Sequence, residues 1–442
     1  MPRLCRGIVL RKIMAVENNN EEFQYIKERM KQRPINRKKL VRRTILTASM
    51  AVIFGVLACF TFLVLEPVFT NLLYPQEEPQ IVEIPEDEDE ILPEDMMLVE
   101  RKVPSTITRI IEHKSDVDPM QVYEDQYTDM YSISREILKS IVTIEGYNQD
   151  VDWFDNEYAS KTNTTGLYIA DNGLQLLFLT HNDVIKNASE IVVTFYDGTV
   201  ASGAIKQSDY NTGLSIVAVN IDDVGSATMQ NIVPAVLANS KVTSLLATPV
   251  IAVGKLYGTK EAVGYGMIVS KGEYINLVDQ NYEMLMTNIY GSTVATGVIT
   301  NTRGEVLGII DQTYNSGEVS NIVSAIGISE IKKDIERMSN GKNRARMGIY
   351  GIDVPDRAHE ELGVPYGAYV TNIVMGSPAM AAGIQSGDII VKVAGKDILR
   401  FSDFTDCMID RMVDVTIPVS VRRQGVDEYR ELELEITLDE LK

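Results

Sequence analysis

The chain has 442 residues, of which 45% are hydrophobic and 24% charged, and its formal net charge is −20. This length suits two or three domains, and the composition excludes a wholly disordered, collagen-like or polytopic membrane protein. The acidic excess argues against nucleic-acid binding, which requires a basic face. Three cysteines, odd in number and widely spaced, exclude a disulfide framework and a cysteine-rich zinc site.

The charge is distributed very unevenly along the chain. Residues 1–43 contain 13 Lys+Arg against 4 Asp+Glu, residues 44–65 contain no charge, and residues 66–442 contain 29 basic against 58 acidic residues. We therefore expect the two ends of the chain to face different environments.

The uncharged segment from Thr44 to Leu65 is predicted to cross a membrane. Its 22 residues contain no proline, and as a helix they would extend about 33 Å, enough for a hydrocarbon core of about 30 Å. Basic residues directly precede it, so we expect a cytoplasmic tail over residues 1–43 and an exported remainder. A cleaved signal peptide is the alternative, but this apolar run is long, starts late and has no small-residue cleavage site directly after it. Whether translation starts at Met1 or Met14 stays open.

Residues 66–131 are predicted to form an acidic stalk. Within them, residues 76–97 combine runs of acids with three prolines, a composition that buries little apolar surface. A calcium site at Glu86 to Glu90 is the alternative, but adjacent carboxylates lack the spaced ligands and turn glycine of a calcium loop. We predict no metal and no cofactor.

From about Ser132 to Met338 the pattern becomes all-β. Short runs of Val, Ile, Leu, Tyr and Thr alternate with Gly-containing turns, which is typical of a sandwich or barrel. Residues 196–199 (Tyr-Asp-Gly-Thr) predict a tight hairpin turn. After Gly327, an amphipathic helix is predicted from apolar positions at helical spacing, namely Ile328, Ile331, Ile335 and Met338. A domain boundary is expected near residues 339–346.

Residues 347–437 form a second predicted domain with its own helix signals. Ser377 suits an N-cap, Pro378 the first helical position and Gly383 a left-handed stop, and residues 387–388 (Gly-Asp) suit a turn into a strand. The spacing resembles the PDZ domain of HtrA-type proteases.

That resemblance implies a small β-sandwich that binds the C-terminal strand of a peptide at its edge. The segment Met347-Gly348-Ile349 matches the family's carboxylate-binding loop. A helix around Phe404 to Met412 would supply the groove wall, with Met408 and Met412 as apolar candidates. Ordinary core packing is an equally weighted alternative for these two methionines.

The all-β region also resembles the trypsin-type double β-barrel of the HtrA/Deg family over residues 132–338. The similarity lies in residues 249–258 (PVIAVGKLYG), 263–269 (VGYGMIV) and 301–309 (NTRGEVLGI). The expected fold is therefore all-β, a trypsin-like double β-barrel followed by a PDZ domain and preceded by one transmembrane helix. This is the layout of the membrane-tethered stress-sensor branch. The resemblance further implies a homotrimer, for which Tyr123, Tyr127 and Tyr131 are candidate contacts.

A serine protease of this type needs a serine, a histidine, an acid and backbone donors for the oxyanion. By the family's motifs, Asp183 takes the histidine position, Gly213 the aspartate position and Ala295 the serine position. The β-branched residues Thr293 and Val294 also disfavour the backbone that aims amides at an oxyanion. The resemblance thus predicts a pseudoprotease.

A displaced catalytic pair is the competing hypothesis. Of the three histidines, His113 lies in the predicted stalk and His359 in the predicted PDZ domain, which leaves His181. Ser292 is the hydroxyl near the serine position. These two residues are the candidates for an atypical active endopeptidase, although hydrogen-bond reach of about 2.6 to 3.2 Å would require both to be repositioned.

The favoured reading is a membrane-anchored, inactive HtrA-like protein of a bacterial cell membrane. Its PDZ domain would bind exposed or C-terminal peptide segments of extracytoplasmic proteins, in envelope quality control or as a signalling scaffold. The alternatives are the atypical serine endopeptidase and a signalling adaptor whose output is the basic tail. A basic tail beside a membrane more often serves as an orientation signal and a lipid contact.

Overall fold

The computed structural model describes residues 42, 45–61, 79–87, 118–151, 157–258, 262–425 and 428–441. The chain divides into two compact units, Met1–Gln76 and Glu77–Lys442. In the first unit, residues 45–61 form a helix. Within the described residues, no helix is both long and apolar enough to span a membrane. The predicted span extends at both ends beyond the described helix, and the predicted tail, Arg42 apart, also lies outside the described residues.

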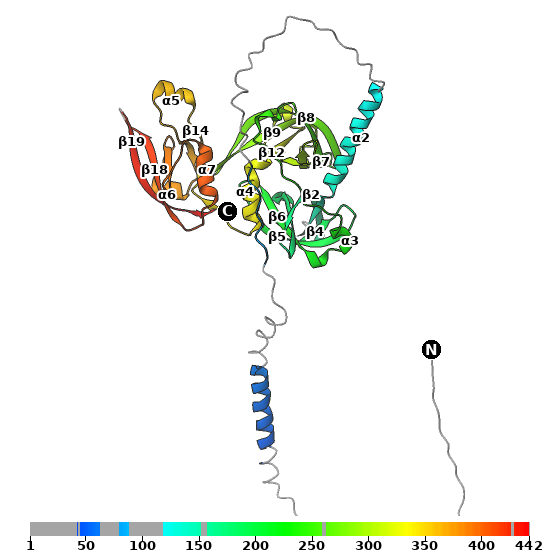
Figure 1. The fold of residues 1–442 in the computed structure, drawn as a ribbon. Coiled ribbons are helices and arrows are strands. Elements are labelled where there is room, and N and C mark those ends of the chain that lie inside the picture. Colours follow the sequence, from blue (N-terminus) through cyan, green and yellow to red (C-terminus); the bar gives the residue numbers. More distant parts are fainter. Residues whose placement is uncertain are drawn as a thin grey trace, which may run out of the picture. The chain divides into compact units, whose positions relative to one another are not determined.

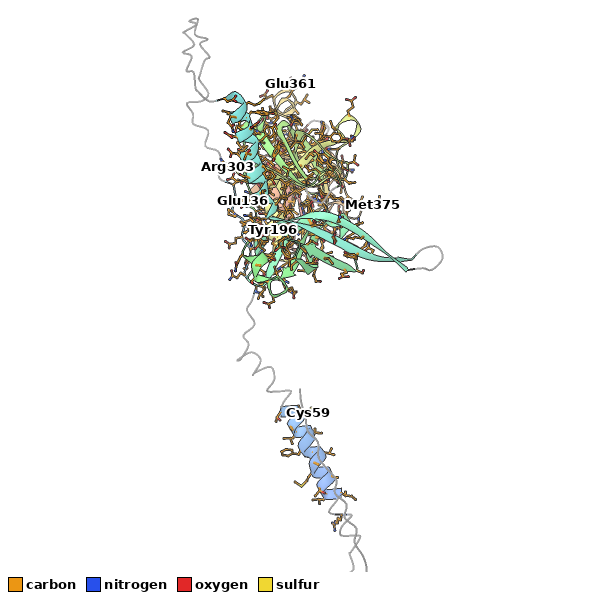
Figure 2. All side chains as sticks on the ribbon, turned by 90° about the vertical axis from the view of Figure 1, so that its right-hand side faces the viewer. Cys59, Glu136, Tyr196, Arg303, Glu361 and Met375 are labelled. Carbon is orange, nitrogen blue, oxygen red and sulfur yellow. The ribbon has the colours of Figure 1, made fainter. Side chains whose placement is uncertain are left out.

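The first barrel is closed and has the strand order β1-β2-β3-β6-β5-β4. An apolar cluster fills its interior, where the ring of Phe178 packs between those of Tyr168 and Phe195. Figure 2 shows the paired β1 and β2 reaching beyond the barrel wall. The strands are β1 (Ile141–Val151), β2 (Glu157–Asp171), β3 (Gln175–His181), β4 (Glu190–Thr194), β5 (Val200–Asp209) and β6 (Leu214–Asn220), with short helices η2 (Asn182–Val184), η3 (Ile221–Asp223) and α3 (Ser226–Met229).

The hairpin turn predicted at residues 196–199 is confirmed. It joins β4 to β5, and the Phe195 N–H donates to the Thr199 carbonyl at 2.8 Å. Gly198 has a φ of +85°, a left-handed conformation that favours glycine. A local signal in the sequence therefore correctly placed this strand connection.

The second barrel is also closed, in the order β10-β11-β12-β9-β8-β7. It has its own apolar interior, and a further cluster lies between the two barrels and the helices that cover them. The elements are η4 (Thr243–Leu245), β7 (Pro249–Lys255), β8 (Ala262–Leu277), β9 (Gln280–Tyr290), β10 (Thr296–Thr300), β11 (Val306–Ile310), η5 (Gly317–Val319) and β12 (Ile322–Gly327). The predicted trypsin-like double barrel is confirmed.

Helix α4 (Ile328–Ser339) confirms the predicted amphipathic helix. All four of its predicted apolar positions are fully buried, and the helix contacts β5 and β6 of the first barrel and β11 and β12 of the second. Figure 1 shows it in yellow between the two barrels. Burial of this face against both barrels therefore helps to hold them together.

Helix α2 (Pro119–Leu138) precedes the first barrel and contacts β7. Asp118 caps it by accepting a hydrogen bond from the Met120 N–H at 3.0 Å. The sequence-based boundary at residue 132 falls inside this helix. Its three tyrosines at 123, 127 and 131 are largely exposed, and Tyr127 also meets the ring of Tyr265 edge-on.

Part of the predicted stalk packs against the folded body. The Val82 side chain is buried, and its N–H donates to the Asn340 Oδ1 at 3.0 Å. Asp87 pairs with Lys332 and Glu86 with Lys333, both on α4. Composition alone suggested a solvated linker, but basic residues on α4 neutralise these acids.

The PDZ domain is built on a sheet in the order β14-β15-β16-β18-β19, with β17 paired to β16. The predicted cap is confirmed, because the Ser377 side chain accepts from the Met380 N–H and Gly383 ends the helix at φ +88°. The elements are β13 (Ala345–Arg346), β14 (Ile349–Asp353), α5 (Asp356–Leu362), β15 (Ala368–Ile373), α6 (Pro378–Ala382), β16 (Ile389–Val393), β17 (Lys396–Asp397), α7 (Phe401–Ile409), β18 (Thr416–Gln424), β19 (Tyr429–Thr437) and β20 (Asp439–Glu440).

A buried ionic network joins the first barrel, α4 and the segment leading to the PDZ domain. The Arg344 Nη1 lies 3.0 Å from the Asp209 Oδ2 and 3.1 Å from the Asp334 Oδ1. Arg337 also pairs with both carboxylates. Burial alone would raise the pKa of Asp209, but the two guanidinium groups hold that pKa below its usual range. Each buried charge in this network is therefore stabilised by the opposite charges of its partners.

We predict that Arg344→Met destabilises the folded body by about 3 to 5 kcal/mol, because a buried pair that loses one partner leaves carboxylates poorly compensated. Urea unfolding followed by circular dichroism measures the change. Arg357→Ala is the control, since the Arg357–Glu361 pair on α5 is exposed and should contribute little. Equal midpoints for both variants would contradict a stabilising network.

Candidate functional site

The three positions that the family resemblance aligns with a protease triad lie beside the ends of β3, β6 and β10. Thr180, at the end of β3, donates to the Thr165 carbonyl on β2 at 3.0 Å. The Thr165 hydroxyl lies 3.1 Å from the Thr296 hydroxyl, at the start of β10 in the other barrel. These hydrogen bonds bring the ends of β3 and β10 together. Fold geometry thus assembles the region where a trypsin-like enzyme performs its chemistry.

Asp183, which the family resemblance aligns with the histidine position, lies in η2, directly after β3. Its side chain is 81% exposed and pairs with Lys186 at 3.2 Å. A carboxylate has no imidazole ring to relay a proton from a serine, so this position does not supply the general base of a triad.

Gly213 takes the aspartate position and carries no side chain that could orient a base. It has a φ of +69°, and its carbonyl accepts from the Asn182 N–H at 2.7 Å. This bond keeps the ends of β3 and β6 aligned. The position that the resemblance aligns with the aspartate therefore contributes a backbone contact and no carboxylate.

Ala295, which the family resemblance aligns with the serine position, is 2% exposed, within the apolar cluster of the second barrel. Its N–H donates to the Ser292 carbonyl at 2.9 Å. The Val294 N–H donates to the Ser292 Oγ at 3.3 Å. The amide at the serine position is thus engaged within its own turn, whereas an oxyanion hole requires such donors to point at the substrate.

His181 has carboxylate neighbours rather than a hydroxyl partner. Burial lowers the pKa of its imidazole, and the nearby carboxylates of Asp311 and Asp183 act in the opposite direction. Asp311 follows β11, is 4% exposed and accepts from the Thr313 N–H at 2.8 Å. Among the described residues, no hydrogen bond joins His181 to Ser292. The displaced pair is not assembled in this conformation.

The second candidate site is the loop that leads into β14 of the PDZ domain. Three consecutive amides, those of Met347, Gly348 and Ile349, point at one position. Gly348 has a φ of +92°, and a Cβ at this residue would lie 2.3 Å from the Ser377 Cβ. Only glycine fits without a shift, so Gly348 sets the geometry of this anion-binding nest.

The position that the three amides face is occupied by the carboxylate of Asp279. Its Oδ2 accepts from the Met347 N–H at 2.7 Å and from the Gly348 N–H at 2.9 Å, and its Oδ1 accepts from the Ile349 N–H at 2.9 Å. Burial raises the pKa of Asp279, whereas these backbone donors favour its ionised form. Asp279 lies in the turn between β8 and β9 of the second barrel, so the barrel supplies the carboxylate.

The two methionines predicted for the groove wall differ in placement. Met408 is buried in the PDZ core on α7. Met412 lies beyond the end of α7 at Ile409 and is 73% exposed. The helix begins at Phe401 and ends earlier than expected. The core-packing alternative therefore describes Met408, and Met412 does not belong to α7.

Two residues of these sites were not found from the sequence. Asp311 follows an apolar strand with no motif of its own, and Asp279 lies in a two-residue turn 68 positions before the first amide that it meets. Their roles depend on tertiary contacts alone. In the part of the chain that the structure describes, no cluster of three or more His, Cys, Asp or Glu side chains could hold a metal ion.

Known families match both folded parts. A trypsin-like peptidase domain matches residues 164–309, which include all three triad positions, and a PDZ domain matches residues 369–423. The chain is 26% identical over 290 residues to "Serine protease Do-like HtrA" of Bacillus subtilis (strain 168), covering 61% of this chain and 62% of that protein. It is 24% identical over 280 residues to "Serine endoprotease DegS" of Haemophilus influenzae (strain ATCC 51907 / DSM 11121 / KW20 / Rd), covering 61% and 76%.

A third relative, "Probable periplasmic serine endoprotease DegP-like" of Hahella chejuensis (strain KCTC 2396), is 28% identical over 243 residues, covering 53% of this chain and 48% of the relative. The chain thus spans about three fifths of the length of the Bacillus subtilis relative and about half of the length of the Hahella chejuensis relative. Among solved structures, "HtrA-type protease AlgW with decapeptide" superposes with a TM-score of 0.52 at 16% identity, covering 71% of this chain and 99% of that one. This likeness supports the fold.

Proposed function

We propose that this HtrA-like protein, which joins a trypsin-like peptidase domain to a PDZ domain, is a membrane-anchored peptide-binding protein without protease activity. Its ligands would be exposed or C-terminal segments of extracytoplasmic proteins in a bacterial envelope. Its role would be quality control or a signalling scaffold. The observation that carries the proposal is the contrast between a degenerate triad and an intact nest of three backbone amides.

The loss of activity is argued from the residues that occupy the triad positions. Acyl transfer by this fold requires a hydroxyl nucleophile activated by a base. Ala295 offers no nucleophile, Asp183 no imidazole and Gly213 no carboxylate. The bonded amide of Ala295 adds a second obstacle, because a developing oxyanion would have to break that bond first.

Peptide binding is argued from the nest and from the strand beside it. A chain terminus needs donors for its carboxylate and a free strand edge for its backbone, which is how a peptide adds a strand to a PDZ sheet. The amides of residues 347–349 form such a set of donors, which the Asp279 carboxylate occupies in this structure, and β14 is the terminal strand of its sheet order. The solved protease named above was determined with a decapeptide, which is the class of ligand proposed here.

In chains that also carry Asp279→Gly, so that no carboxylate of the chain itself occupies the nest, we predict that Gly348→Ala weakens binding of peptides with a free C-terminal carboxylate by at least about tenfold, because displacing one charge-assisted hydrogen bond costs about 1.5 to 3 kcal/mol. Fluorescence anisotropy of the full chain with a labelled decapeptide pool, random in its last three positions, measures the effect. Gly395→Ala is the matched control, since Gly395 also has a positive φ of 83° but open space around it.

The same pool with amidated C-termini tests recognition of the carboxylate. We expect no binding of the amidated pool to the wild-type protein. Equal binding of both pools, or equal affinity of the Gly348→Ala and Gly395→Ala variants, would show that the nest does not hold a terminus.

We predict no hydrolysis of casein by the full chain above the buffer rate, because the triad positions lack the required groups. Gel electrophoresis over several hours detects fragments. Ser292→Ala and His181→Ala are assayed alongside. Cleavage by the wild type that both substitutions abolish would establish the atypical endopeptidase, whereas equal cleavage by all three proteins would indicate a contaminant.

Anchoring through Thr44 to Leu65 is supported by the charge distribution and by the placement of relatives described as periplasmic. We predict that the chain stays in the membrane pellet after alkaline carbonate extraction. In spheroplasts, added protease should remove a C-terminal epitope and leave an N-terminal one. Release at alkaline pH would refute the anchor, and the opposite protection pattern would refute its orientation. The homotrimer stays a prediction.

A further inference from the structure

The turn between β8 and β9 imitates the end of a bound peptide. Besides its carboxylate bonds to the three nest amides, Asp279 donates its own N–H to the Ile349 carbonyl at 2.8 Å. A peptide adding a strand beside β14 would present the same pair of groups, a carboxylate for the nest and an N–H for the first strand carbonyl. Asp279 supplies both the carboxylate and the N–H from a single residue.

The turn also contacts both sides of the groove. On the strand side, Asn281 donates to the Gly351 carbonyl at 3.0 Å. On the helix side, the Thr405 hydroxyl on α7 donates to the Asp279 carbonyl at 3.3 Å. Asp279 itself is 2% exposed. The turn therefore fills the end of the groove where a terminal carboxylate would lie.

We infer that Asp279 is an internal competitor that closes the PDZ groove, and that a ligand with a free C-terminal carboxylate binds only by displacing it. This inference rests on the proposed peptide-binding function. Three amides in one nest cannot serve two carboxylates at once, and two like charges at this distance repel each other. The bound and docked states are therefore mutually exclusive.

Displacement would couple ligand binding to the contact between the barrels and the PDZ domain. Because the competitor belongs to the same chain, its effective concentration is high and does not change with protein concentration. The apparent affinity for a peptide equals its intrinsic affinity multiplied by the fraction of molecules whose groove is open. A bound peptide would, in turn, release the β8–β9 turn from the PDZ domain.

The backbone geometry of the turn permits substitutions of Asp279 that introduce no backbone strain. Asp279 has a φ of +61°, which asparagine and glycine tolerate well. Asp279→Asn keeps the size and removes the charge and one acceptor, and Asp279→Gly removes the side chain while suiting the turn. Asp414 is the matched control, because it has a φ of +63° and an exposed side chain, and it lies in the PDZ domain away from the nest amides.

The experiment compares the wild type, Asp279→Asn, Asp279→Gly and Asp414→Asn as full chains. Hydrogen exchange of the amides of residues 347–349, read by mass spectrometry, reports the docked contact without any ligand. Anisotropy with the free-carboxylate decapeptide pool reports binding. We expect exchange and affinity both to rise at least about tenfold in the two Asp279 variants, which is about 1.4 kcal/mol, and neither to change in Asp414→Asn.

The outcomes separate the inference from the proposed function. Equal peptide affinity in the wild type and both Asp279 variants would overturn the competition and leave peptide binding intact. Absence of binding in all four proteins would overturn peptide binding and the competition with it. Unchanged exchange at residues 347–349 would show that Asp279 does not hold the nest. Circular dichroism confirms that each variant is folded.

Discussion

A buried carboxylate must replace its lost hydrogen bonds to water by hydrogen bonds within the protein, and this constraint applies to Asp279. Three backbone amides of the PDZ loop meet the requirement. The neighbouring Gln280 accepts from Arg344, which belongs to the buried ionic network. One corner of the second barrel thus connects the PDZ groove to the charges that join the first barrel and α4. Displacement of Asp279 from the groove would therefore affect the hydrogen bonds of that network.

The fold is compatible with the proposed loss of protease chemistry, because the barrels are stabilised by their apolar cores. Ala295 belongs to the apolar cluster of the second barrel, and the threonines that bridge the barrels lie beside the triad positions without depending on them. An alanine at this position is therefore compatible with an intact core. A fold of this kind can be retained for binding, since function resides in the site and not in the architecture.

Local signals in the sequence were reliable where a few neighbouring residues decide the structure. The turn at residues 196–199, the buried face of α4 and the cap at Ser377 were all predicted correctly, because φ preference, periodicity and capping act over a few positions. The folded part of residues 79–87 was missed for the opposite reason. Their acids are matched by lysines on α4 that lie far away in the chain.

The sequence by itself, through its patterns and its resemblance to a known family, determined the two barrels and the PDZ domain, whereas the assignment of the triad positions stays a prediction. Only the tertiary structure decided what those residues meet. It bonded the Ala295 amide to the Ser292 carbonyl, placed Asp311 near His181 and Met408 in the core, and set Asp279 into the carboxylate nest. These outcomes depend on the docking of separate elements, and no local preference encodes the distance between two side chains from different domains.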